Sequence, residues 1–179
     1  MSTATANLEN DHIHILRLID VMDCISHESE ANVEHLEAIV NIIRNFADGL
    51  HHAKEENLLF PKMVEKGFSF EQGPIAVMMH DHVLGRNFVK GMSDNIALYK
   101  AGNKASLTEV FRNFNGYGEL LKAHIAKENN VLFRMADKVL SGDEQQVLLN
   151  QFHEEEKKPA CAENNCIIQI DNLVKLYNL

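Results

Sequence analysis

The sequence predicts an all-α protein, an up-down-up-down four-helix bundle with an extra C-terminal helical segment. Apolar residues recur at intervals of three and four along most of the 179 residues, which is the period of an amphipathic helix. Only three prolines interrupt this pattern. No stretch alternates with period two for long enough to indicate a strand. Long amphipathic helices joined by short polar breaks are typical of a bundle.

The first two helices follow from the polar break near residue 28. We expect them over residues 8–26 and 32–66. Pro61 lies inside the second helix and is expected to kink it near Leu58, because the proline ring excludes one backbone hydrogen bond. Gly67 is expected to end that helix.

The later helix starts are predicted from side chains with capping-box spacing. Three such pairs occur: Ser69 with Gln72, Ser106 with Glu109, and Ser141 with Glu144. They predict helices over residues 74–102 and 106–140 and a shorter fifth helix. After Pro159, an apolar stretch at residues 167–176 is expected to pack along the bundle. We therefore expect a bundle domain over residues 1–157 and a C-terminal helical extension over residues 158–179.

Composition excludes several classes of partner. The chain is 45% apolar and carries a net charge of −9, so it lacks the basic excess that binding to nucleic acid or an anionic membrane needs. No uninterrupted apolar run reaches membrane-spanning length, and residues 1–7 do not resemble a signal peptide. Three cysteines fit a reducing compartment, although Cys161 and Cys166 are a weak signal for a metal site or a regulatory disulfide. We expect a cytoplasmic protein.

A duplicated motif is the most informative feature of the chain. Residues 51–60 (HHAKEENLLF) and 124–133 (HIAKENNVLF) are identical at seven of ten positions. In each copy a histidine precedes a glutamate by four residues: His51 with Glu55, and His124 with Glu128. An Asp-His pair lies 39 and 42 residues upstream of these histidines, and it contributes His12 and His82.

These motifs converge when they are placed on an antiparallel bundle. Two of the histidines lie near the start of their helices and two lie past the middle of the following helices. The start of one helix is level with the end of the next, so all four should share one layer, at one end of the core. A histidine and a glutamate four residues apart face the same way. The expected metal ligands are His12, His51, Glu55, His82, His124 and Glu128.

This donor set favours two metal ions, each held by two histidines, with Glu55 and Glu128 bridging them. Mixed nitrogen and oxygen donors suit iron, with manganese or zinc as alternatives, and the lack of cysteine ligands argues against an iron–sulfur cluster. Two histidines and two shared carboxylates leave open positions on each ion. O2, peroxide or NO could bind there.

Other residues near the motif remain alternatives. The second copy has Ile125 and Asn129 where the first has His52 and Glu56, so only the register of His51 and Glu55 occurs twice. His80 is the reserve ligand. Tyr117 is either a core residue or a donor near the metals. The two aspartates of the Asp-His pairs either accept an N–H from a ligand on a neighbouring helix or lie on the surface. Helical spacing around His124 predicts an inward face with these members: Phe114, Tyr117, Leu121, Val131 and Met135. Three further histidines are expected to be exposed: His27, His35 and His153.

The chain resembles the hemerythrin-like domains, also called HHE cation-binding domains, over about residues 8–157. The matching residues are Asp11-His12, His51-His52-x-x-Glu55-Glu56-x-x-Leu59-Phe60-Pro61, Asp81-His82-x-x-x-Arg86 and His124-Ile125-x-Lys127-Glu128-x-x-Leu132-Phe133, with Gly73-Pro74-Ile75 and Leu140-Ser141-x-x-Glu144. The resemblance implies a four-helix bundle around two non-haem iron ions with an oxo or hydroxo bridge and bridging glutamates.

The chain departs from the family's oxygen carriers in two places. The carriers have a further histidine where this chain has Met78, and they end with a histidine and an aspartate where this chain has His124 and Glu128. A symmetric centre of four histidines and two glutamates is more similar to the branch that includes the iron–sulfur cluster repair proteins. Those proteins usually carry a short cysteine-bearing N-terminal domain, which residues 1–7 do not supply.

Two classes of function follow from this resemblance and these donors. The first is a protein that binds or senses O2, NO or peroxide at a carboxylate-bridged diiron centre, with a small diatomic ligand or peroxide as its partner. The second is a diiron enzyme that reduces peroxide or NO, with an electron-donor protein, or that supplies iron for cluster repair. An iron-storage role fits less well, because ferritin-like sites use Glu-x-x-His spacing and more carboxylates.

Overall fold

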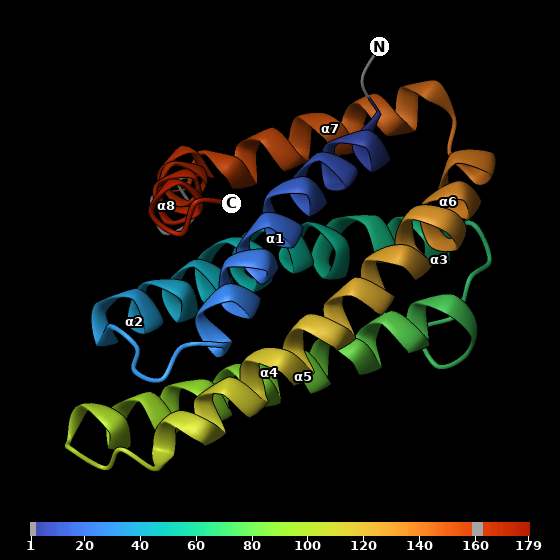
Figure 1. Ribbon diagram of the computed structural model, residues 1–179. Helices are drawn as coiled ribbons and strands as arrows, with labels where there is room; N and C mark the ends of the chain where they lie inside the picture. Colours follow the sequence, from blue (N-terminus) through green and yellow to red (C-terminus); the bar gives the residue numbers. More distant parts are fainter. Residues whose placement is uncertain (1–2, 159–162) are drawn as a thin grey trace.

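Four long helical rods form an antiparallel bundle in the computed structural model, which describes residues 3–158 and 163–179 (Figure 1). The first rod is α1 (Ala4–Ser26), and the third is α4 (Gly73–Lys100). The second joins α2 (Val33–Ile42), the π-helical segments η1 (Ile43–His52) and η2 (Glu55–Leu59), and α3 (Phe60–Glu65). The fourth joins α5 (Ser106–Lys127), the π-helical segment η3 (Glu128–Leu132) and α6 (Phe133–Val139). The predicted all-α bundle is confirmed, and no strand occurs in the described residues.

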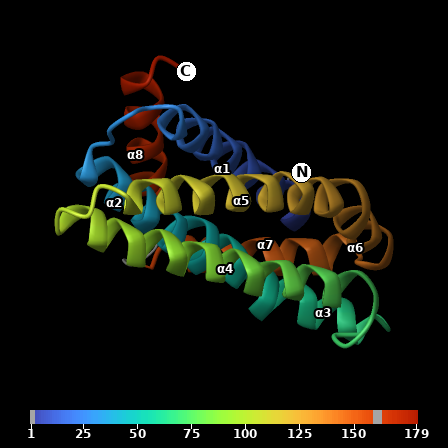
Figure 2. The same ribbon diagram turned by 60° about the horizontal axis from the view of Figure 1, so that its bottom comes forward.

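Two further helices cover the bundle. α7 (Gly142–Glu156) packs beside α1 (Figure 1). α8 (Glu163–Leu176) contacts α1, α2 and η1, and it crosses the bundle instead of running along it, so that Figure 1 views it nearly end-on (Figure 2). Cys166, Ile170 and Leu173 of α8 are buried in the bundle's core. Cys161 lies outside the described residues.

Capping side chains explain three of the helix starts, and at α2 the cap is Asn32, whose Oδ1 accepts a hydrogen bond of 2.8 Å from the Glu34 N–H. α1 begins at Ala4, earlier than predicted, because Thr3 Oγ1 accepts a hydrogen bond of 3.1 Å from the Ala6 N–H. Ser141 and Glu144 form the predicted capping box at the start of α7.

The other two predicted capping boxes are wrong. Ser69 Oγ accepts a hydrogen bond from the Glu71 N–H, and α4 begins later, at Gly73. Ser106 is itself the first residue of α5 and caps nothing, and Glu109 pairs with Arg112 instead. Gly67 follows α3 as predicted, with a φ of 98° that other residues rarely adopt.

A π-helical turn follows the repeated glutamate in both copies of the motif. The Phe60 N–H bonds the Glu55 carbonyl, and the Phe133 N–H bonds the Glu128 carbonyl, five residues back in each case. The kink expected at Pro61 stays a prediction, but the π turn does not depend on that proline, because the second copy carries Arg134 at the equivalent position and makes the same turn. The turn belongs to the motif and not to the proline.

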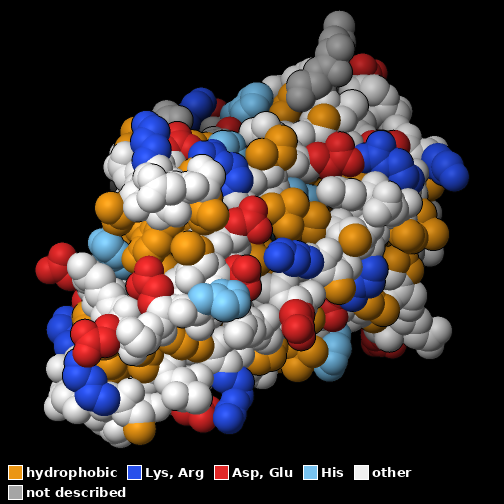
Figure 3. Space-filling view, in the orientation of Figure 1, with side chains coloured by type: hydrophobic (Ala, Val, Ile, Leu, Met, Phe, Trp, Pro, Cys, Tyr) orange, Lys and Arg blue, Asp and Glu red, His pale blue; other side chains and the backbone are white. Residues whose placement is uncertain are grey.

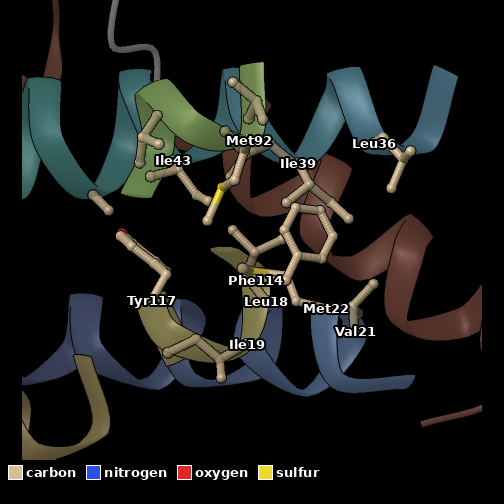
Figure 4. Close-up of a cluster of buried hydrophobic side chains, with 14 of the residues drawn as sticks. Leu18, Ile19, Val21, Met22, Leu36, Ile39, Ile43, Met92, Phe114 and Tyr117 are labelled. Atoms are coloured by element: carbon tan, nitrogen blue, oxygen red, sulfur yellow. The ribbon is translucent and has the colours of Figure 1, made fainter. Parts of the chain in front are cut away.

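The core consists of two apolar clusters. The larger one lies between the four rods of the bundle and is also lined by α8. It includes Met22, Ile39, Met92 and Phe114 (Figure 4). The smaller one is built around Phe60, Phe133 and Phe152, at the end where α3, α6 and α7 meet. The motif histidines and glutamates are buried between these clusters. The polar layer was predicted at one end of the core, and this is wrong, because α1 and the segments after the glutamates extend beyond it.

The surface is mixed in charge. Acidic, basic and apolar side chains alternate on the face shown in Figure 3. Among residues 3–158 and 163–179, none of the helices combines the length and the apolar character needed to span a bilayer.

Candidate metal centre

Four histidines from four rods meet as two pairs inside the bundle. His12 of α1 and His51 of η1 face each other with their Nε2 atoms 3.0 Å apart. His82 of α4 and His124 of α5 do the same at 3.2 Å. All four side chains are buried. Two nitrogens bound at right angles to one ion, each at about 2.1 Å, would be about 3.0 Å apart, so both separations suit a pair of ligands on a common ion.

The two glutamates lie between the histidine pairs. Glu128 places one oxygen 3.2 Å from His12 Nε2 and the other 3.1 Å from His124 Nε2. Oε2 of Glu55 lies 3.4 Å from His82 Nε2 and 3.8 Å from His51 Nε2. Each carboxylate thus reaches one imidazole of each pair, as a group shared by two ions must.

The outer nitrogen of every paired imidazole is held by an oxygen acceptor. His12 Nδ1 donates to Asn129 Oδ1 at 2.8 Å, and His82 Nδ1 donates to Glu56 Oε1 at 2.7 Å. His51 Nδ1 donates to Asp11 and His124 Nδ1 to Asp81, both at 3.2 Å. The proton of each neutral ring therefore lies on Nδ1, which leaves a lone pair on Nε2.

The histidine pairs and the two glutamates place several hydrogen-bond acceptors close together without a donor. The Nε2 lone pairs of each histidine pair point at one another, and no hydrogen bond reaches either oxygen of Glu55 or Glu128. Buried acceptors without partners cost free energy, and buried charge costs more. A cation at each histidine pair would satisfy both requirements. The described residues contain two groups able to hold a metal ion: His12, His51 and Glu128, and His52, Glu55, His82 and His124.

The pKa shifts reflect the same crowding. Burial and the neighbouring charge of Glu128 raise the pKa of Glu55 well above its ordinary value. Burial opposes ionisation of Glu128 too, but positive charge on His124 and His12, when those rings are protonated, lowers the pKa of that carboxyl well below its ordinary value. Burial lowers the pKa of His51 to about 4. A neutral His51 is the form that a metal ligand needs.

A lysine lies behind each of the two aspartates. Lys54 Nζ donates to Asp11 at 3.1 Å and to Glu156 of α7 at 2.6 Å, and its side chain is fully buried. Lys127 pairs with Asp81, and its side chain remains 41% exposed. Although burial favours the neutral acid, His51 and Lys54 hold the pKa of Asp11 below its ordinary value. Both aspartates therefore orient a histidine on a neighbouring helix, the first of the two predicted alternatives.

The structure brings together all six predicted side chains, and it also includes residues that the sequence did not indicate. Glu56 and Asn129 each follow a motif glutamate, and each accepts a hydrogen bond from a histidine Nδ1. Their equivalent positions in the two copies could have indicated this shared role. His52 was set aside because the second copy has Ile125 there, yet it is buried and stacked on His82 at 3.9 Å between ring centroids. His80, the reserve ligand, is exposed.

Three predictions about neighbouring side chains are also corrected. Val131 and Met135 are 45% and 38% exposed, because the π turn at Glu128 adds a residue to the helical turn and places Leu132 and Phe133 inside instead. His27 and His153 are exposed as predicted, but His35 is only partly exposed and donates to or accepts from the Tyr177 hydroxyl at 2.7 Å.

Tyr117 is buried, as both readings of its role require, and it also borders a surface pocket. Figure 4 shows its hydroxyl at the margin of the larger apolar cluster, pointing away from the other labelled side chains. Burial raises the pKa of this phenol, so it stays protonated. Within the described residues, no hydrogen bond links the Tyr117 hydroxyl to a histidine of either pair.

Together, the bundle and its buried layer of histidine and glutamate define a helical domain with side chains that could hold metal cations. Residues 3–136 match the hemerythrin HHE cation binding domain, and the chain belongs to this family. No curated protein and no solved structure matches the chain.

Proposed function

We propose that this protein is a hemerythrin-like non-haem diiron protein that binds or senses O2, NO or peroxide. His12 and His51 would hold one iron, and His82 and His124 the other. Glu55 and Glu128 would bridge the two ions. The observation that carries the proposal is the set of facing Nε2 lone pairs and undonated carboxylate oxygens, which together require positive charge at two adjacent points.

The donor chemistry supports iron. Imidazole nitrogen with carboxylate oxygen is a set that iron accepts readily, and no cysteine contributes to either group of candidate ligands. Two histidines and two shared carboxylates leave positions open on each ion. Bound iron would supply a redox-active centre at which a small ligand can bind. The protein's own residues exclude bulk water, because the six side chains are at most 2% exposed.

Metal analysis of natively loaded protein tests this proposal. We expect two iron ions per chain, with optical and Mössbauer spectra of a coupled pair. His51→Ala and Glu128→Ala should lower the metal content, because each removes a donor that no neighbour replaces. His80→Ala is the matched control, since this exposed histidine should leave the content unchanged. Full iron content in the first two variants would refute the ligand assignment.

Binding and turnover are separated by a second measurement. A diferrous form that gives a stable oxy spectrum, reversed by removing O2, supports a carrier or sensor. Many turnovers of peroxide or NO, with an electron donor present, would instead support the enzyme alternative.

A further inference from the structure

A surface pocket adjoins the candidate metal centre on one side of the bundle. Its volume is about 190 Å³, and its lining includes Asp48, His52, Gly85, Arg86 and Tyr117. The pocket lies where η1, α4 and α5 meet. Of these residues, His52 alone also belongs to the buried cluster of candidate ligands, so it borders both the pocket and the centre.

His52 has one nitrogen occupied and one without a partner. Nδ1 faces Asp48 Oδ1 at 3.4 Å, and Arg86 holds that carboxylate at 2.8 Å through Nε. With the proton on Nδ1, Nε2 is an acceptor, and it is buried with no hydrogen bond. An unsatisfied acceptor in this position calls for a donor.

Ring orientation argues against His52 as a further ligand of the same ion as His82. The two rings are stacked 3.9 Å apart at 18°. An imidazole lone pair lies in the plane of its ring, so an ion in the plane of His82 lies out of the plane of His52. One nitrogen of His52 is nevertheless within 4.8 Å of the donor atoms of Glu55, His82 and His124. This places the imidazole of His52 beside the candidate ligands, where a molecule bound at the centre would need orientation.

The acceptor at His52 has no counterpart in the other half of the duplication. The position equivalent to His52 is Ile125, which offers no acceptor. The long π-helical segment η1 ends at His52, whereas the second copy is regular α-helix up to Lys127. π-Helical insertions occur frequently at functional sites.

We infer that this pocket admits the centre's small-molecule ligand and that His52 Nε2 accepts a hydrogen bond from it, so that the site favours a protic ligand, hydrogen peroxide or a small hydroperoxide, over an aprotic one such as NO. The inference rests on the proposed metal centre. Hydrogen peroxide carries the O–H that the acceptor requires, and NO has no hydrogen to donate. The volume of the pocket suits a molecule of a few heavy atoms.

His52→Leu tests the acceptor in iron-loaded protein. We expect its bimolecular rate with hydrogen peroxide to fall about tenfold, the loss typical of one hydrogen bond, with NO affinity and metal content unchanged. His52→Gln, which keeps an acceptor oxygen, should recover part of the peroxide rate. His80→Leu is the control on the exposed surface of α4.

Gly85→Val tests the access route separately. A Cβ at Gly85 would lie 3.6 Å from Tyr117 Cε2, which is ordinary contact, and the further methyl groups of valine should narrow the pocket that both residues line. We expect the rate with tert-butyl hydroperoxide to fall more than the rate with hydrogen peroxide.

Each outcome separates this inference from the proposed function. Wild-type protein without paired metal ions would refute the proposed function itself. Intact metal and NO binding, with an unchanged peroxide rate in His52→Leu, would mean that Nε2 holds only a structural water, and the inference would be wrong. Loss of metal in His52→Leu would make His52 a ligand and would also overturn it.

Discussion

The two halves of the duplication have nearly the same inner geometry and very different surroundings. In each half an aspartate accepts a hydrogen bond from a histidine on a neighbouring helix, and a lysine forms an ion pair with that aspartate. Lys54, in the first half, is fully buried beneath Glu156 and Phe152 of α7. Lys127, in the second half, is 41% exposed. The donor atoms therefore keep the symmetry of the repeat, whereas α7 and the pocket at His52 make its two sides unequal.

Removing the two lysines should produce the largest difference between the halves. Lys54→Met leaves Asp11 and Glu156 without their cation in a buried place, so we expect a loss of about 3–5 kcal/mol in the free energy of unfolding. Lys127→Met should cost at most about 1 kcal/mol, because the side chain of Lys127 is 41% exposed and water can replace it. Urea unfolding of both variants measures this. Equal losses would mean that α7 does not seal the first half.

The π turn is common to both halves and predicts a contrast between neighbouring residues. Leu132→Ala should destabilise the protein by about 2–5 kcal/mol, because Leu132 is fully buried. Val131→Ala should change stability by less than about 0.5 kcal/mol, because that side chain is 45% exposed. The reverse order in thermal unfolding would mean that the helix continues as a regular α-helix through Glu128.

Substitution of the two aspartates tests which of their roles is the same in both halves. Asp11→Ala and Asp81→Ala should each lower metal affinity by about 10–100-fold, because each leaves a histidine Nδ1 unheld. Only Asp11→Ala should also destabilise the metal-free protein strongly, since it removes a partner from buried Lys54. Metal titration with a competing chelator and unfolding of the metal-free form measure the two effects. A stability loss as large in Asp81→Ala would contradict the asymmetry.

The smallest predicted effect concerns the attachment of α7. Ser141→Ala removes the capping box and should cost about 1 kcal/mol. Because α7 buries Lys54 and leaves Lys127 exposed, amide hydrogen exchange should increase more around Lys54 than around Lys127. A uniform increase across both halves would indicate that α7 stabilises the whole bundle.

Several features of the fold could be predicted because they depend on local pattern. The period of apolar residues indicated the bundle, and the duplicated motif indicated which histidines and glutamates meet. The capping box at Ser141 was predicted correctly because both partners lie within one turn. The boxes expected at Ser69 and Ser106 failed, although their spacing is the same. Spacing permits a cap, but the backbone path before the helix decides whether it forms.

The π turns and the burial of His52 could not be predicted in the same way. A sequence with helical period is compatible with hydrogen bonds to the fourth or the fifth residue back, and the difference decides whether Val131 or Leu132 faces the core. His52 lacks an equivalent in the second copy, so comparison of the repeats discarded it. Only the packing of His52 on His82 in the folded protein shows that this histidine is buried beside the candidate ligands.

From the sequence alone one could read the helical architecture, the family and the six side chains that converge, because the repeat places them at matching depths on adjacent rods. Tertiary structure decided which oxygen holds each imidazole, which lysine is buried and which side has a pocket. Those features depend on contacts between residues more than 25 positions apart, and their distances follow from packing and not from the spacing along any one helix.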